Sequence, residues 1–186
     1  MCIRDSNGSI KVFDIDGRVN LKTSNGAIRA SGISGELEAR TSNGSIEATE
    51  QSGNAILHTS NGRIRAEVSN GALEATTSNG GMEVRLSGSE SERPVRLESS
   101  NGHIEVTLDS VRDIRASTSN SAITVRLPES ARARVRARTS NSSINTDFQE
   151  LAQAIDNKKS LNGVLGGGGP LVDLSTTNGQ IRLLRR

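Results

Sequence analysis

The chain has 186 residues, of which 32% are hydrophobic and 1% are aromatic, so it has room for one domain but lacks the bulky side chains of a conventional globular core. Its 23 basic and 21 acidic residues give a net charge of +2, which excludes the strong uniform field of a general nucleic-acid or anionic-membrane binder. The single cysteine, Cys2, excludes an internal disulfide and a cysteine-based metal site. No apolar run approaches the roughly 18 residues of a transmembrane helix.

The first six residues differ in character from the rest of the chain. Met-Cys-Ile-Arg-Asp-Ser resembles the translated adapter sequence found at the ends of metagenomic gene predictions. We interpret residues 1–6 as a non-native leader and residues 7–186 as the domain. On this interpretation the chain is a fragment, and any export signal or membrane anchor preceded it.

From residue 7 onward a nine-residue unit recurs, and its turn signal alternates between two kinds. Ser-Asn-Gly or Thr-Ser-Asn-Gly returns every 18 residues, and a second Gly-containing dipeptide such as Asp16-Gly17 or Ser34-Gly35 lies midway. A short fixed period is typical of a repeat architecture. The recurring asparagines are Asn7, Asn25, Asn43, Asn61 and Asn79.

Within each unit, apolar residues occupy the fourth and sixth positions and polar residues occupy the positions between them, as in Ile46-Glu47-Ala48. This alternation is typical of a strand with one buried face, and Asn-Gly or Ser-Gly then forms the turn. The pattern predicts an all-β, single-domain β-solenoid with coils of about 18 residues, each made of two strand-turn units of about nine residues. A meander of antiparallel hairpins is the alternative, since Asn-Gly also closes hairpins.

Stacked coils would place equivalent turn residues in one column, with successive residues of the column about 4.8 Å apart. We therefore predict a structural turn ladder in which amides pass hydrogen bonds from coil to coil, with a threonine column beside it. The ladder residues are Asn25, Asn43, Asn61 and Asn79, and the threonines are Thr23, Thr41, Thr59 and Thr77.

The second half of the chain repeats less regularly, so looser coils are expected there. Asn101, Asn120 and Asn141 follow at spacings of 22, 19 and 21 residues. The segment 148–159 predicts a short helical or irregular excursion. Four glycines and Pro170 then predict a flexible turn, after which the strand pattern returns over residues 172–183.

One row of basic residues is a candidate binding surface. Because they alternate with Ala and Val, the four arginines are expected on one outward strand face, where they could hold phosphate or another anionic group. A solvated strand face is the alternative. Without aromatic platforms, nucleic-acid binding is not expected. The row consists of Arg132, Arg134, Arg136 and Arg138.

No residue pattern indicates catalysis, a metal or a cofactor. The two histidines, His58 and His103, show no ligand spacing and are interpreted as surface residues. The acidic residues Glu38, Glu47 and Glu74 lie at outward positions that alternate with basic ones, which favours a salt-bridged solvent face over an acid–base pair. We therefore expect a protein that is not an enzyme.

Three stretches resemble a known family: the repeated Thr-Ser-Asn-Gly-x-Ile turns, residues 139–148 (Thr-Ser-Asn-Ser-Ser-Ile-Asn-Thr-Asp-Phe), and the closing segment 166–183. They resemble the bacterial adhesin-like β-strand repeat family, a domain of unknown function found in envelope-associated and exported proteins. The resemblance implies a β-solenoid-like domain, often attached to a membrane anchor. It also implies a location in the cell envelope or outside the cell, and it supplies no catalytic residue or ligand.

The preferred interpretation is therefore a non-enzymatic surface domain that contacts an envelope polymer, a membrane surface or a protein partner. One alternative is a polysaccharide-active β-helix enzyme built on an outward carboxylate. Another is a passive spacer or oligomerisation scaffold, because the open ends of a solenoid can stack on one another.

Overall fold

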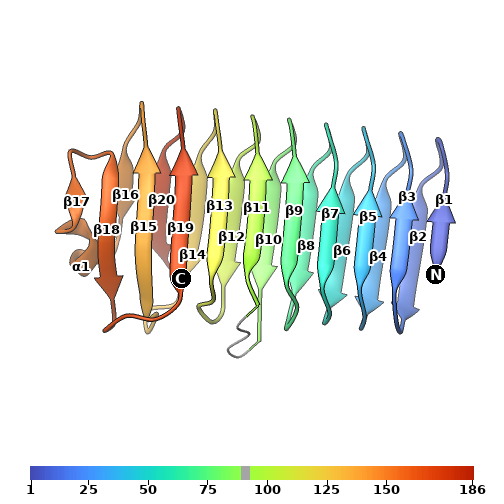
Figure 1. The fold of residues 1–186 in the computed structure, drawn as a ribbon, viewed down its shortest axis with the longest axis horizontal. Coiled ribbons are helices and arrows are strands. Elements are labelled where there is room, and N and C mark those ends of the chain that lie inside the picture. Colours follow the sequence, from blue (N-terminus) through green and yellow to red (C-terminus); the bar gives the residue numbers. More distant parts are fainter. Residues whose placement is uncertain (89–92) are drawn as a thin grey trace.

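The computed structural model describes residues 1–88 and 93–186 as one flattened β-solenoid with two facing sheets (Figure 1). Successive strands of the repeat alternate between an 11-stranded sheet (sheet A) and a 9-stranded sheet (sheet B). Equivalent strands of successive coils pair in parallel, as Ile28 with Ile46 and Ile46 with Ile64. The predicted single β-solenoid with two strands in each coil is thus confirmed, and the parallel pairing excludes the hairpin meander.

The two sheets contain all strands of the described residues. In spatial order, sheet A contains β1 (Cys2–Arg4), β3 (Val19–Lys22), β5 (Leu37–Arg40), β7 (Ala55–His58), β9 (Leu73–Thr77), β11 (Val95–Ser99), β13 (Ile114–Thr118), β19 (Leu171–Thr176), β15 (Ala133–Thr139), β18 (Ser160–Leu165) and β17 (Ile155–Asp156). Sheet B contains β16 (Ile144–Thr146), β20 (Ile181–Arg185), β14 (Ile123–Leu127), β12 (Ile104–Leu108), β10 (Met82–Leu86), β8 (Ile64–Val68), β6 (Ile46–Gln51), β4 (Ile28–Ile33) and β2 (Ile10–Ile15).

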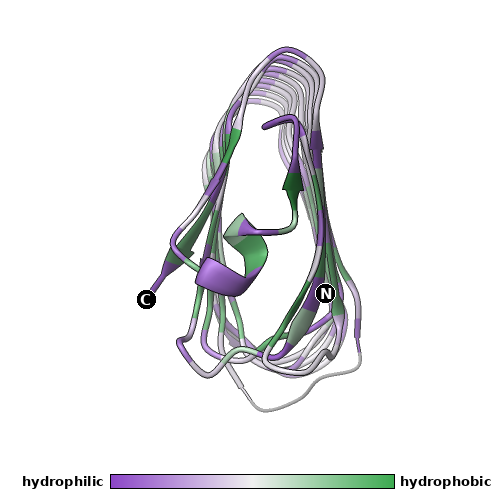
Figure 2. Cartoon of the chain, turned by 90° about the vertical axis from the view of Figure 1, so that its left-hand side faces the viewer, coloured by the Kyte–Doolittle hydropathy of each residue, from purple (hydrophilic) through white to green (hydrophobic). Residues whose placement is uncertain are grey.

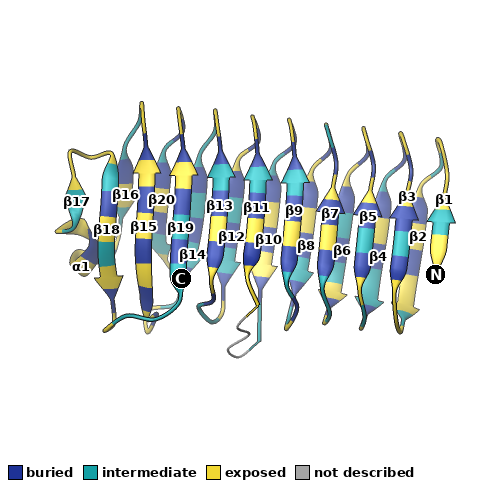
Figure 3. Cartoon of the chain, viewed as in Figure 1, coloured by how far each residue is buried: buried dark blue, intermediate teal, exposed yellow. Residues whose placement is uncertain are grey.

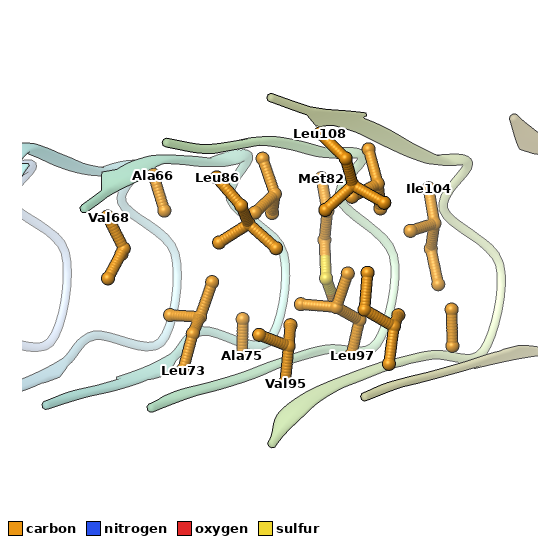
Figure 4. Close-up of a cluster of buried hydrophobic side chains, with 14 of the residues drawn as sticks. Ala66, Val68, Leu73, Ala75, Met82, Leu86, Val95, Leu97, Ile104 and Leu108 are labelled. Atoms are coloured by element: carbon orange, nitrogen blue, oxygen red, sulfur yellow. The ribbon is translucent and has the colours of Figure 1, made fainter. Parts of the chain in front are cut away.

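The core is the narrow space between the sheets, filled by the fourth and sixth residues of each unit. Burial alternates along the strands (Figure 3), and two facing rows of apolar side chains meet between the sheets, with Met82 and Leu86 opposite Leu73 and Leu97 (Figure 4). Ile46 and Ala48 are at most 1% exposed. Small residues suffice because each coil only has to cover its neighbours in a thin continuous stack.

The Thr-Ser-Asn-Gly turns are held from inside by their threonines. Thr41 Oγ1 donates a hydrogen bond to the carbonyl oxygen of Gly26 in the preceding coil (3.1 Å) and accepts one from the Gly44 N–H in its own turn (3.3 Å). Equivalent bonds recur at Thr59, and both threonines are buried. The threonine column thus lies beneath the turn and satisfies backbone groups, which explains why Thr recurs with the 18-residue period.

Arg112, in the turn between β12 and β13, is the largest fully buried side chain in the described part of the chain, at 1% exposure. Its guanidinium donates hydrogen bonds to the carbonyl oxygens of Ser69 (3.0 Å), Ser87 (3.1 Å) and Gly71 (3.4 Å), which belong to the turns of two earlier coils. Burial lowers the pKa of Arg112. Arg112 therefore ties together three turns in the region where the repeat becomes irregular.

The last coil in the sequence does not lie last in space. Strand β19 lies between β13 and β15, and β20 lies between β14 and β16, so residues 171–185 form a coil inserted between two earlier ones. Stacking in chain order, which the repeat alone would suggest, ends at β14. The four-glycine turn that enters β19 has Gly166, Gly167 and Gly168 at positive φ, a backbone conformation that glycine adopts at low cost.

The excursion after β16 forms a cap. It contains a short helix, α1 (Gln149–Ala152), followed by β17 and β18, which run antiparallel to their neighbours. Figure 2 looks onto this end of the molecule and shows α1 between the ends of the two sheets. Phe148 and Leu151 are buried there, so the cap covers the apolar strip of the outermost coil.

At the other end, part of the segment interpreted as a leader is structured. Cys2–Arg4 forms β1, which pairs in parallel with β3, and the Asp5 carboxylate accepts hydrogen bonds from the N–H groups of Asn7 and Gly8 (both 3.0 Å). These N–H groups, Gly8 foremost, lower the pKa of Asp5. Residues 2–5 thus take the place that a repeat unit would take, and their non-native origin stays a prediction.

Candidate functional site

The predicted turn-ladder residues form a continuous chain of side-chain hydrogen bonds. The Nδ2 group of Asn43 donates to Oδ1 of Asn25 (2.8 Å), Asn61 donates to Asn43 (2.7 Å), and Asn79 donates to Asn61 (2.7 Å). The ladder extends beyond the predicted residues at both ends. In spatial order it consists of Asn7, Asn25, Asn43, Asn61, Asn79, Asn101, Asn120, Asn178 and Asn141.

Within this ladder each interior amide is both donor and acceptor to its neighbours. The bonds run along the exposed turn edge, where Thr-Ser-Asn-Gly segments stack. Each interior amide uses one of its two N–H donors and one of its two acceptor sites in the ladder. The ladder therefore holds the turns of successive coils in register.

The four predicted arginines do lie together. Arg134, Arg136 and Arg138 are in β15, Arg132 directly precedes it, and all four are exposed, alternating with the buried Ala133, Val135 and Ala137. We call this surface the arginine face. Strand β15 lies between β19, to which it is parallel, and β18, to which it is antiparallel (Figure 3). Backbone pairing with both neighbours therefore fixes the positions of the arginines on β15.

The residues beside the arginine face are shorter than the arginines. On β18 they are Ser160, Asn162 and Val164, and on β19 they are Leu171, Asp173 and Ser175. Asp173 is the one acid in this set, and it lies in register with Arg136 on one side and Arg115 on the other. The arginines are therefore flanked by shorter side chains that carry hydroxyl, amide and aliphatic groups and, at Asp173, a carboxylate.

The arginine face differs from those outward arginines that form ion pairs with a neighbouring strand. Across the described ranges, outward arginines such as Arg29 and Arg126 pair with Glu47 (3.2 Å) and Glu105 (2.9 Å) on neighbouring strands. No ion pair within 4.0 Å involves any member of the arginine face among residues 1–88 and 93–186, although Arg134 Nε donates a hydrogen bond to the Gly169 carbonyl oxygen (3.2 Å). Four positive charges are thus left without a carboxylate in contact.

Two shallow clefts adjoin this surface. The larger, about 860 Å³, lies at the start of β15 and is lined by Asp109, Asp113, Arg132, Arg134 and Pro170, among others. The smaller, about 570 Å³, runs over β7 to β19 and shares Asp113. The larger cleft lies where the chain passes from β18 to β19, which both belong to sheet A. In the regular coils a turn from a strand of sheet B leads into each strand of sheet A, and the inserted coil has no such turn before β19.

Other candidate groups are not brought together. His58 lies on the outer face of β7 and His103 lies in the turn before β12, both exposed. In the part of the chain that the structure describes, no three His, Cys, Asp or Glu side chains converge on a point where a metal ion could bind. Among the described residues, no helix has the length and apolar character needed to cross a bilayer.

The family assignment follows from the same repeat that builds these surfaces. The family model described as Toastrack DUF4097 matches residues 3–184, nearly the whole chain. The chain belongs to the Toastrack family. No curated protein and no solved structure matches it.

Toastrack is a domain family of unknown function with a β-helix-like fold, so the membership confirms the fold and the expected domain of unknown function but assigns no site. The adhesin-like and bacterial character of the expected family stays a prediction. The sequence located both the ladder and the arginines of this Toastrack domain, because each follows from period and alternation. It missed the two clefts and the neighbours of the arginine face, since these depend on where β18 and β19 are inserted.

Proposed function

We propose that this Toastrack domain is a non-enzymatic, adhesin-like contact module of the cell envelope or extracellular surface, which binds an anionic polymer through the arginine face. The observation that carries the proposal is the row of four exposed arginines, three on β15 and one directly before it, that form no ion pair within 4.0 Å in the described structure. Guanidinium groups bind phosphate and carboxylate groups in bidentate geometry.

The environment of the acidic residues supports binding over turnover. The outward carboxylates of Glu36, Glu47 and Glu105 each contact an arginine of a neighbouring coil. The partner of Glu36 is Arg18. These carboxylates therefore lie in a salt-bridged solvent face, the arrangement that the sequence favours over an acid–base pair. The location in the envelope rests on the family resemblance of the sequence.

The proposal is tested by co-sedimentation of the purified domain with bacterial cell-wall and membrane fractions over a series of salt concentrations. We expect binding to the cell-wall fraction that weakens as salt increases, because the contacts are charge–charge contacts at an exposed surface. The triple variant Arg134→Gln, Arg136→Gln and Arg138→Gln should lose this binding and keep its circular dichroism spectrum.

A matched control variant carries the same change in charge on the other side of the molecule. Arg63→Gln, Arg85→Gln and Arg182→Gln remove three exposed arginines of sheet B and its turns. This control should bind as the unmodified chain does. Equal losses in the two triple variants would show that only net charge matters, and binding to no fraction would favour a passive spacer. Binding to the membrane fraction alone would replace the polymer by a lipid surface.

A further inference from the structure

We propose that the polymer bound by the arginine face is a base-free linear phosphodiester, such as poly(glycerol phosphate), lying along β15 across the width of the solenoid. This inference rests on the proposed function and names the chemical class of its ligand. It is carried by the spacing of the four charges, three on β15 and one directly before it, and by the residues that flank that strand.

The spacing of the arginines is fixed by the strand. Arg132, Arg134, Arg136 and Arg138 recur at every second residue, so their Cα atoms are about 6.6 Å apart along the strand. Two residues contain six backbone bonds. A glycerol phosphate repeat also contains six backbone bonds from one phosphorus to the next, and a chain of that many bonds extends about 7 Å. One phosphate can therefore face each arginine in succession without a change of register.

The charges favour this direction over one along the solenoid axis. A polymer that ran along the axis at the level of Arg136 would pass Asp173 and then Arg115, which are its in-register neighbours on β19 and β13. Asp173 would repel a phosphate at that point. Along β15 all three outward side chains are arginines and Arg132 directly precedes them, so the nearest side chain at each position attracts the polymer.

Three of the six flanking residues, beside Arg136 and Arg138, fit a hydroxyl-bearing chain. Ser160 and Asn162 lie beside Arg138 and Arg136 on β18, and Ser175 lies beside Arg138 on β19. These side chains supply hydrogen-bond donors and acceptors at the level of the polymer backbone. Such groups suit the oxygens and free hydroxyls of a polyol phosphate.

Nucleic acid has the same six-bond phosphodiester spacing but presents bases that proteins bind by aromatic stacking. The chain has two aromatic residues. Phe148 is buried at 3% exposure under the cap, and Phe13 lies on β2 of sheet B, at the other end of the solenoid. The arginine face therefore offers no stacking platform, and a phosphodiester without bases fits it better.

The test compares four polymers with the full chain at equal concentrations of charge: poly(glycerol phosphate), inorganic polyphosphate, polygalacturonate and a single-stranded oligonucleotide. Binding is followed by fluorescence anisotropy between 50 and 200 mM salt. Four phosphate contacts predict a slope of log affinity against log salt of about −2.8, which is a loss of about 50-fold over this range. The Arg134, Arg136 and Arg138 triple glutamine variant, with one contact left, should show a slope of about −0.7.

We expect poly(glycerol phosphate) to bind at least tenfold more tightly than the other three polymers. Polyphosphate repeats its charge every two backbone bonds, so most of its charges cannot meet an arginine of β15. Equal or tighter binding of polyphosphate, polygalacturonate or the oligonucleotide would overturn the phosphodiester assignment while leaving the arginine face as an anion site. If no polymer binds, both the assignment and the proposed function fail.

Discussion

The side-chain amide of Asn178 donates a hydrogen bond to Oδ1 of Asn120, 2.7 Å away, although 58 residues separate the two in the chain. On its other side, Asn178 accepts a hydrogen bond from Asn141 (2.6 Å). A turn near the end of the chain therefore completes the ladder between two turns that precede it in sequence. The surroundings of the arginine face depend on the same insertion, because β19 is one of the two strands that flank β15.

The inserted position of β19 predicts which engineered cysteines form a disulfide. Ser117 of β13 lies in register with Ser175 of β19, and paired residues of neighbouring strands have Cα atoms about 4.8 Å apart, within the range that a disulfide spans. In a Cys2→Ser background, Ser117→Cys with Ser175→Cys should form a disulfide under mild oxidation, seen as loss of free thiol by mass spectrometry.

The control for this pair tests stacking in chain order. Ser117→Cys with Arg138→Cys places the thiols two strands apart, about 9.6 Å, which exceeds disulfide reach. It should remain reduced. A disulfide between positions 117 and 138 would show that β15 stacks directly on β13 and that the insertion is wrong.

The asparagine ladder predicts that a carboxylate cannot replace an interior amide. Asn61→Asp removes the donor to Asn43 and brings two oxygens together at a former hydrogen-bond distance, while Asn79 keeps its acceptor. The free energy of unfolding at pH 7 should fall by about 1–2 kcal/mol, as measured by urea denaturation. Ser42→Asp, which adds the same charge to an exposed turn residue, should change stability by less than about 0.5 kcal/mol.

The close stacking of turns predicts that glycine is required where coils touch. A Cβ atom on Gly44 would collide with the carbonyl oxygen of Gly26 in the preceding coil, which is a backbone atom and cannot rotate away. Gly44→Ala should lower the free energy of unfolding by about 3 kcal/mol. The adjacent exposed change Ser45→Ala is the control, and similar midpoints for the two variants would contradict the observed coil spacing.

Arg112 predicts a large stability effect from a turn residue. Arg112→Met keeps the length of the side chain but leaves the carbonyl oxygens of Ser69, Ser87 and Gly71 without their guanidinium partner. We expect a loss of about 3 kcal/mol in thermal or urea unfolding. Arg115→Met, at an exposed strand position nearby, should cost less than about 0.5 kcal/mol. Equal effects would show that Arg112 is not held by these carbonyls.

Most of the solenoid could be predicted from sequence because its physics is local and periodic. Alternation placed Ile46 and Ala48 inside and Glu47 outside, and the 18-residue recurrence of Thr-Ser-Asn-Gly placed like turns in one column. Where the period holds, each residue has the same neighbours in every coil, so one rule describes many contacts.

The remaining features depend on choices that a repeat pattern leaves equal. Val135 and Ala137 of β15 occupy the same register positions on β19 as Ile114 and Ala116 of β13, so the pattern does not say which strand lies next to β13. Arg112 was not expected inside, since an arginine in a polar turn usually reaches solvent. The antiparallel pairing of β17 and β18 could not be predicted from the repeat, because the residues of the cap do not follow it.

The inserted coil also has a consequence for synthesis on the ribosome. Strand β15 leaves the ribosome before β19. Both β13 and β15 pair in parallel with β19, and Thr118 of β13 and Thr139 of β15 lie in register with the same residue of β19. If β15 pairs with β13 in the nascent chain, that pairing has to open to admit residues 171–185. Completion of the fold then requires β19 to displace β15 from β13, and a chain interrupted before residue 171 lacks one of the two strands that flank the arginine face.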